Sequence, residues 1–225
     1  MIRLFNVRKV YRQGKNEITA LAGVSLQIRE REFAVIMGPS GSGKSTLLHL
    51  MGGLDRPTEG EVMVEGRIIS QMPDNPVTLF RRQRIGFVFQ FFNLLPTLTA
   101  VENVMLPLIL DGQPRAKAST RAETLLGRVG LSTRKDHLPE ELSGGENQRL
   151  AIARALVFAP PIFLADEPIG NLDSRTGEAI LELIRCINRE EGCTVVMVTH
   201  NPQAARYGDR VIYLRDGLIE DKGSP

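Results

Sequence analysis

Apolar residues in the first part of the chain fall into short runs that polar turns separate. Residues 2–10 and 20–28 carry β-branched and apolar side chains on either side of the turn-like Gln13-Gly14-Lys15-Asn16, which predicts two strands. Residues 33–37 form a continuous apolar run, which is typical of a buried strand. Good helix formers follow at 47–51. The chain therefore begins with strands, and its first helix follows the buried strand at residues 33–37.

Two further short strands are predicted next, as a hairpin. Residues 61–64 and 67–69 are mostly apolar and are split by Glu65-Gly66, a two-residue turn. A short helix is predicted over residues 76–84. Its arginines are most simply interpreted as a solvated face, with contact to lipid head groups as the alternative; they are Arg81, Arg82 and Arg84.

From the middle of the chain onward, helical patterning is interrupted and then alternates with strands. Residues 85–89 predict a strand that ends at Gln90, and residues 99–157 are mainly helical, with breaks near 112–114, 130 and 139. Strands and helices then alternate; the ranges are strand 162–165, helix 174–190, strand 194–198, helix 202–207 and strand 211–214. This alternation predicts an α/β fold with a parallel sheet that helices cover on both faces.

Composition narrows the possible functions without naming one. Of the 225 residues, 42% are hydrophobic and 24% are charged, as in ordinary globular proteins. With 28 basic and 26 acidic residues the net charge is only +2, so we expect no general nucleic-acid binding. The N-terminus has no signal-peptide pattern, and no apolar run approaches the ~20 residues of a membrane span. Any membrane role would use another chain.

The strongest chemical signal lies between the buried strand at 33–37 and the helix that follows. The nine residues fit the phosphate-binding pattern G-x-x-x-x-G-K-[ST]; they are Gly38, Pro39, Ser40, Gly41, Ser42, Gly43, Lys44, Ser45 and Thr46. Glycines let backbone N–H groups converge on phosphate oxygens at a helix N-terminus. Lys44 would reach the β- and γ-phosphates, and the Ser45 hydroxyl would bind Mg²⁺. A glycine-rich turn without function is the alternative, and the flanking strand and helix argue against it.

Two later strands end in side chains suited to the same chemistry. Asp166 and Glu167 follow the strand at 162–165, and the carboxyl ends of strands are where open α/β sheets bind ligands. Asp166 suits a role near Mg²⁺, and Glu167 can polarise the water that attacks a γ-phosphate. The alternative is an ordinary acidic loop. His200 ends the strand at 194–198 and could donate a hydrogen bond to a γ-phosphate, whereas His49 and His137 are interpreted as structural.

A second glycine-rich segment precedes a helix at residues 143–149. Ser143, Gly144 and Gly145 could present another anion-binding helix N-terminus. Ser143 with Glu146 also fits a plain capping box. The shape of this segment alone favours the cap.

Taken together, these motifs identify the chain as similar to the nucleotide-binding subunits of ATP-binding cassette transporters. The segments GPSGSGKST, LSGGENQRLAIARAL, LADEPIGNLD and VTHN occur in the order and spacing of that family, with Gln90 at its Q-loop position. The resemblance implies a P-loop NTPase core with an N-terminal antiparallel β-subdomain. It also implies one domain over residues 1–225, into which a helical subdomain at about 96–157 is inserted. The lipoprotein-releasing and macrolide-export ATPases are the most similar subgroup.

The resemblance also implies partners and site residues. Two copies would sandwich two ATP molecules head to tail, each Ser143-Gly144-Gly145 segment closing over the other copy's phosphate loop. Tyr11 would stack on adenine, although a packed surface tyrosine is the plainer interpretation. Gln90 would contact Mg²⁺ and the attacking water, and the apolar residues from Phe91 to Leu95 would receive an integral-membrane permease subunit. The chain would then lie on the cytoplasmic face of the inner membrane.

Two positions depart from the family pattern. Ile169 stands where the family usually has threonine, and Glu30-Arg31-Glu32 lacks the usual glycine. Neither change removes a catalytic group, so we expect ATPase activity to remain.

The leading hypothesis is an ATPase that drives a transporter of the export or lipoprotein-release type. One alternative is a regulatory ATPase of a membrane complex, as in the similar cell-division ATPase that pairs with a membrane partner and signals without transport. A soluble cassette ATPase of chromosome maintenance, translation or repair, or a small-molecule kinase, is less compatible with the single compact cassette and its LSGG segment.

Overall fold

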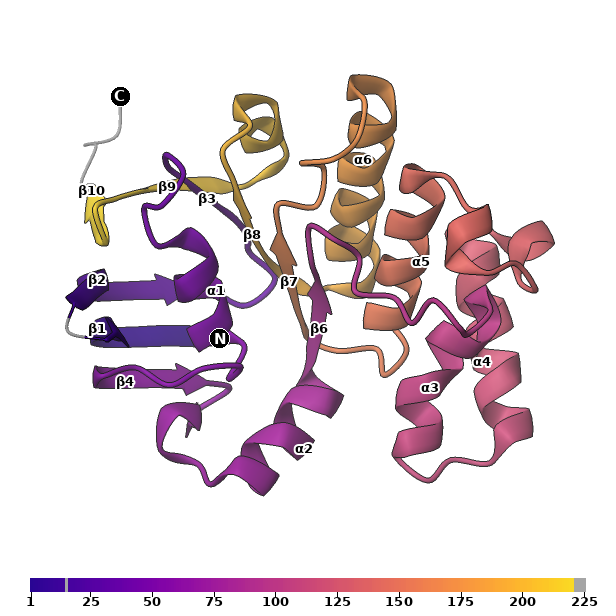
Figure 1. Ribbon diagram of the computed structural model, residues 1–225, viewed down its shortest axis with the longest axis horizontal. Helices are drawn as coiled ribbons and strands as arrows, with labels where there is room; N and C mark the ends of the chain where they lie inside the picture. Colours follow the sequence, from indigo (N-terminus) through magenta and orange to yellow (C-terminus); the bar gives the residue numbers. More distant parts are fainter. Residues whose placement is uncertain (15, 221–225) are drawn as a thin grey trace.

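The computed structural model describes residues 1–14 and 16–220, and it divides along its long axis into sheet and helix layers (Figure 1). A small sheet lies at one end, a larger sheet fills the middle, and a group of helices lies at the other end. Lys15, in the turn expected at residues 13–16, lies outside the described residues. The architecture confirms the α/β fold class with an antiparallel N-terminal sheet.

The small sheet has four antiparallel strands in the order β2-β1-β4-β5. Its strands are β1 Ile2–Gln13, β2 Asn16–Ile28, β4 Glu59–Val64 and β5 Arg67–Ile68. Both long strands extend past the apolar runs that predicted them, because the ladder continues through polar residues to the pair Gln13 and Asn16. Cross-strand pairing therefore carries Tyr11 inside a strand, opposite Ile18.

The large sheet has six strands in the order β10-β9-β3-β8-β7-β6. They are β3 Phe33–Met37, β6 Ile85–Val88, β7 Ile162–Asp166, β8 Thr194–Thr199, β9 Arg210–Arg215 and β10 Leu218–Glu220. Five strands run parallel, and β10 pairs antiparallel with β9. Alternate residues of β3 enter two separate cores: Phe33 and Val35 belong to one, Ala34 and Ile36 to the other. The sheet is thus covered on both faces, as expected.

Six α-helices surround these sheets within the described residues. They are α1 Lys44–Met51, α2 Asp74–Arg84, α3 Ala100–Leu110, α4 Arg115–Arg128, α5 Gly144–Ala155 and α6 Ser174–Glu191. Helices α3, α4 and α5 lie together at one end of the molecule (Figure 1). The helix expected at 202–207 is a 3₁₀ helix, η4 Pro202–Tyr207. Shorter 3₁₀ turns are η1 Ile69–Gln71, η2 Ser132–Arg134 and η3 Pro139–Glu141.

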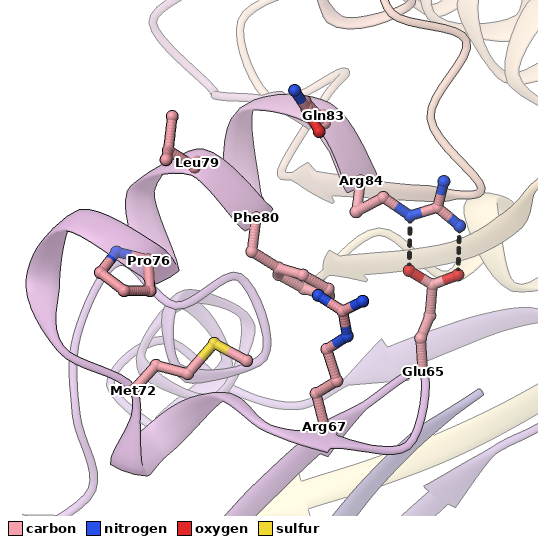
Figure 2. A pocket seen from close by; sticks show the side chains of 8 residues that line it. All are labelled: Glu65, Arg67, Met72, Pro76, Leu79, Phe80, Gln83 and Arg84. Atoms are coloured by element: carbon pink, nitrogen blue, oxygen red, sulfur yellow. Dashed lines mark hydrogen bonds and ion pairs between the residues drawn. The ribbon is translucent and has the colours of Figure 1, made fainter.

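The predicted solvated face at the end of α2 fits Arg84, which is exposed, but not Arg81 and Arg82, which are half-buried. Arg81 donates to the Gly53 carbonyl at 2.8 Å, and Arg82 pairs with Asp111 at 3.2 Å. Figure 2 shows Arg84 making two bonds to Glu65, at 2.7 and 2.5 Å, beside a pocket whose walls include Phe80. The three cations hold α2 against neighbouring segments, and lipid contact is not needed to explain them.

Candidate functional site

The phosphate loop connects β3 to α1, and its glycines are fixed by close backbone contacts. A Cβ at Gly38 would lie 2.0 Å from the Leu214 carbonyl oxygen, and one at Gly43, where φ is 99°, would lie 2.3 Å from the Ala20 oxygen. Lys44 is buried, and its Nζ donates to the Gly38 and Pro39 carbonyls at 3.0 and 2.9 Å. The loop therefore wraps around the lysine ammonium at the N-terminus of α1.

One pocket joins this loop to the carboxyl ends of three neighbouring strands. Gln90 follows β6, Glu167 follows β7 and His200 follows β8. The lining residues are Ile18, Thr19, Ala20, Pro39, Ser40, Gly41, Gly43, Lys44, Ser45, Thr46, Gln90, Glu167 and His200. Gly38 and Ser42 support the loop from behind, since Ser42 is 2% exposed. The structure thus brings together the predicted phosphate loop, glutamine, glutamate and histidine.

Asp166 lies behind Ser45, with two neighbours on its carboxylate. Oδ1 accepts a hydrogen bond from the Ser45 hydroxyl at 2.9 Å, and Oδ2 lies 3.7 Å from His49 Nε2. Burial raises the pKa of Asp166, and the bond from Ser45 opposes that rise only in part. A carboxylate held beside a serine hydroxyl offers two oxygen ligands of the kind that Mg²⁺ prefers.

Glu167 has an unusual backbone and a fixed carboxylate. Its φ is 45°, in the left-handed region, and its N–H donates to the Val198 carbonyl at 3.0 Å. Oε2 accepts from the Thr199 hydroxyl at 3.0 Å and from the His200 N–H at 3.3 Å. Oε1 lies 2.9 Å from His200 Nδ1. Strain and three donors together aim this carboxylate at the pocket.

The bond to Glu167 also restricts His200. A carboxylate only accepts, so Nδ1 of His200 carries the proton in this bond. Nε2 can then donate to a phosphate only when the ring carries both protons. The side chain of His200 is 64% exposed, so Nε2 is accessible from solvent.

The segment after Gln90 is exposed at its tip and held from behind by α5. Phe92 and Asn93 have φ values of 60° and 50°, and their carbonyls accept from Arg154 at 2.9 and 2.6 Å. Phe91 is 73% exposed, whereas Leu94 packs against the core. The apolar docking surface expected at residues 91–95 is therefore carried mainly by Phe91 and Leu95.

Ser143 does not reach the phosphate loop of its own chain. It caps α5 in a capping box, in which its hydroxyl donates to Glu146 at 2.8 Å and the Glu146 N–H donates back at 3.3 Å. Gly144 and Gly145 begin the helix behind it. Among the described residues, these three are outside the pocket lining.

Tyr11 also lies beside the pocket rather than in its lining. Its hydroxyl donates to Asp55 at 2.8 Å, and it is 39% exposed. Its strand partner Ile18 and its neighbour Thr46 both line the pocket. The tyrosine thus stands at the rim.

Sequence reasoning missed the place of His49 in this site. Ser45 and His49 are four residues apart on α1, so they share one face of the helix, and both reach Asp166. That spacing was a usable signal. The pairing of Asp55 with Tyr11 joins residues 44 positions apart and had no local signal.

A family model described as "ABC transporter" matches residues 21–170, which is most of the chain. The chain belongs to the ABC transporter family. As expected from its motifs, this ABC protein is an ATP-binding ATPase subunit of a transporter. Within the described residues, no helix of this ABC ATPase has the length and apolar character to cross a membrane.

Similar proteins cover nearly the whole ABC ATPase. An uncharacterized ABC transporter ATP-binding protein of Methanocaldococcus jannaschii, MJ0796, is 53% identical over 98% of this chain and 95% of its own length. A lipoprotein-releasing system ATP-binding protein LolD of Syntrophus aciditrophicus is 48% identical over 97% of this chain and 98% of its own. A macrolide export ATP-binding/permease protein MacB of Rhodopirellula baltica is 49% identical over 98% of this chain, which spans 33% of that protein.

A solved structure matches as well. A dimeric post-hydrolysis state of the MJ0796 cassette bound to ADP and Pi superposes with a TM-score of 0.91 at 50% identity, covering 98% of this chain and 97% of that one. The expected resemblance to the lipoprotein-releasing and macrolide-export group is confirmed by the LolD and MacB relatives.

Proposed function

We propose that this ABC ATPase hydrolyses Mg²⁺-bound ATP in a site shared by two copies of the chain, and that it drives a separate permease of the export or lipoprotein-release type. The observation that carries the proposal is the meeting of Lys44 and Glu167 in one pocket. Lys44 supplies positive charge where phosphates would bind, and Glu167 supplies a fixed carboxylate where water would attack.

The phosphate loop from Gly38 to Thr46 holds the triphosphate through its backbone amides and Lys44. The donor set fits Mg²⁺, since Ser45, Asp166 and Gln90 all offer oxygen atoms. Among the described residues, no cluster of three or more His, Cys, Asp or Glu could hold a metal. Few protein ligands suit Mg²⁺, which keeps water and phosphate oxygens as its other ligands. When bound, the ion would neutralise phosphate charge.

Hydrolysis depends on Glu167 and His200. The carboxylate of Glu167 is fixed by the Thr199 hydroxyl and the His200 N–H, so it can orient a water and accept its proton without rearranging. His200, with both ring nitrogens protonated, donates through Nε2 to the γ-phosphate. Gln90 lines the same pocket from the neighbouring strand end, where it would contact the same water.

A second copy completes the site. Gly144 and Gly145 offer N–H donors at the start of a 12-residue helix that Ser143 caps, yet all three residues lie outside the pocket of their own chain. A head-to-tail pair places this helix end on the partner's phosphates. Residues 1–225 act as one nucleotide-binding domain, and the helical subdomain at about 96–157 carries the donors to the partner.

The permease docks on Phe91 and Leu95, which are 73% and 42% exposed. Arg154, near the C-terminal end of α5, bonds to this segment, and Ser143 caps the N-terminal end of the same helix. Helix α5 therefore connects the docking surface to the donor segment. The chain lies on the cytoplasmic face of the inner membrane through this contact.

The test of hydrolysis is Glu167→Gln, which keeps the shape of the side chain and removes its basicity. We expect the ATPase rate to fall by about 10²-fold or more, the scale of losing a general base. ATP affinity should stay within about twofold of the original chain. Glu182→Gln, on α6, is the control and should leave the rate unchanged. Normal turnover by Glu167→Gln would contradict the assignment.

A further inference from the structure

Tyr11 is held by a small polar network at the rim of the pocket. Its hydroxyl donates to Asp55 Oδ2 at 2.8 Å, while Asp55 Oδ1 accepts from Lys9 Nζ at 2.7 Å and from the Arg56 N–H at 2.7 Å. Lys9 also donates to the Arg56 carbonyl at 2.7 Å. Every polar atom in this network has a partner.

The network also occupies one side of the tyrosine ring. Lys9 Nζ lies 4.8 Å from the ring centroid, in cation–π contact. Lys9 and Tyr11 are two residues apart on β1, so their side chains share a face of the strand. Because Tyr11 is still 39% exposed, its ring is not enclosed.

The pKa values of Asp55 and Tyr11 are both shifted in the direction that keeps the hydrogen bond between them. Burial opposes ionisation of Asp55, but the bonds from Lys9 and Tyr11 outweigh it and lower the pKa of Asp55. Burial and the bond to Asp55 raise the pKa of Tyr11, so its hydroxyl keeps its proton and remains the donor. The side chain of Lys9 is only 13% exposed.

Asp55 is itself fixed relative to the phosphate loop. It follows α1, whose first residue is Lys44, and the Leu54 N–H still donates to His49 of that helix at 2.9 Å. Beyond it, Thr58 is tied to β1 through the Val10 N–H at 3.0 Å. The position of the tyrosine ring is therefore set from the same helix that begins at the phosphates.

We propose that Asp55 and Lys9 are positioning residues that fix the Tyr11 ring as the platform for the nucleotide base, and so make this site favour a base-bearing triphosphate over a bare polyphosphate. The inference rests on the stacking of adenine on Tyr11, which the family resemblance implies and which we propose as part of the function of this site. A ring already held in place loses no rotamer freedom when the base binds, which improves affinity. The cation on one face leaves the other face for the base.

The experiment measures dissociation constants for Mg-ATP and for inorganic Mg-tripolyphosphate by calorimetry. Asp55→Ala should weaken ATP binding about three- to tenfold, the scale of one immobilised side chain, and leave tripolyphosphate within about twofold. Tyr11→Phe, which removes only the hydroxyl, should weaken ATP in the same direction and guards against misfolding of the Asp55 variant. Glu59→Ala is the control, because Glu59 also pairs with β1, through Arg8, but does not contact Tyr11.

A double variant separates positioning from general support of the fold. In a Tyr11→Ala background, Asp55→Ala should cause no further loss of ATP affinity, because there is no ring left to position. Full additivity would overturn the inference, as would equal losses for ATP and tripolyphosphate or no loss in Asp55→Ala. If Tyr11→Ala alone leaves ATP affinity unchanged, the stacking of adenine on Tyr11 fails, and the positioning role fails with it.

Discussion

At the scale of single residues, the chemistry of the site depends on which side-chain atoms already make hydrogen bonds within the chain. Nδ1 of His200 is bonded to Glu167, so only Nε2 is left to bind a phosphate. Glu167 in contrast keeps two other donors, the Thr199 hydroxyl and the His200 N–H, whatever side chain stands at position 200. We therefore expect the imidazole to be replaceable as a support for Glu167 but not as a donor to a phosphate.

Two amide variants test this division of roles. The side-chain nitrogen of asparagine replaces Nδ1, and that of glutamine replaces Nε2. We expect His200→Gln to keep more ATPase activity than His200→Asn, and His200→Ala to lose about 10²-fold, as when one oriented donor is removed. Steady-state kcat at saturating ATP measures it. Higher activity in His200→Asn would mean that supporting Glu167 is the main role.

At the scale of elements, the sequence patterns located strands and helices better than the turns and contacts between them. The buried strand at Phe33–Met37 was predicted with its exact bounds, because continuous apolar runs mark strands covered on both faces. The polar end of β1 was missed, since its pairing depends on the partner strand. The contacts of the α2 arginines were not predicted, because their partners, such as Glu65, come from other segments.

In the turn before β3, the missing family glycine leaves an arginine in a strained backbone conformation. Arg31 has a φ of 61°, in the left-handed region that favours glycine. It lies in the segment Glu30-Arg31-Glu32, where the family usually has a glycine. Its N–H donates to the Thr194 hydroxyl and its carbonyl accepts from Asn188, so the neighbours hold the conformation. Ile169, the other departure, is buried in the core.

Replacing Arg31 with glycine should stabilise the chain. Glycine adopts this φ without a steric penalty, and both hydrogen bonds use backbone atoms that it retains, so we expect the free energy of unfolding to rise by about 0.5–1 kcal/mol. Urea unfolding with an unchanged m-value measures it. Glu30→Gly, whose φ is not in the left-handed region, should instead destabilise. A loss of stability in Arg31→Gly would show that the arginine side chain outweighs the strain.

At the scale of the whole molecule, the two halves of the proposed shared site lie on different parts of the chain. The carboxyl ends of β3, β6, β7 and β8 surround the phosphate loop, and this could be predicted because parallel strands end at one edge. The donor segment at Ser143 lies at the start of α5, outside that pocket. No pattern within one chain shows what such a segment binds, and we propose that a second copy supplies the phosphate.

Light scattering of Glu167→Gln with and without saturating Mg-ATP tests the shared site most directly. Slow hydrolysis should leave ATP between two chains, so the measured mass should double when ATP is added. Adding Ser143→Arg to this variant should keep the mass of a single chain, because a bulky side chain obstructs the partner's phosphates. As the control, adding Ser132→Arg should leave the doubling of the mass unchanged. A Glu167→Gln protein that keeps the mass of one chain at saturating ATP, or a Ser143→Arg double variant that still doubles, would contradict the account.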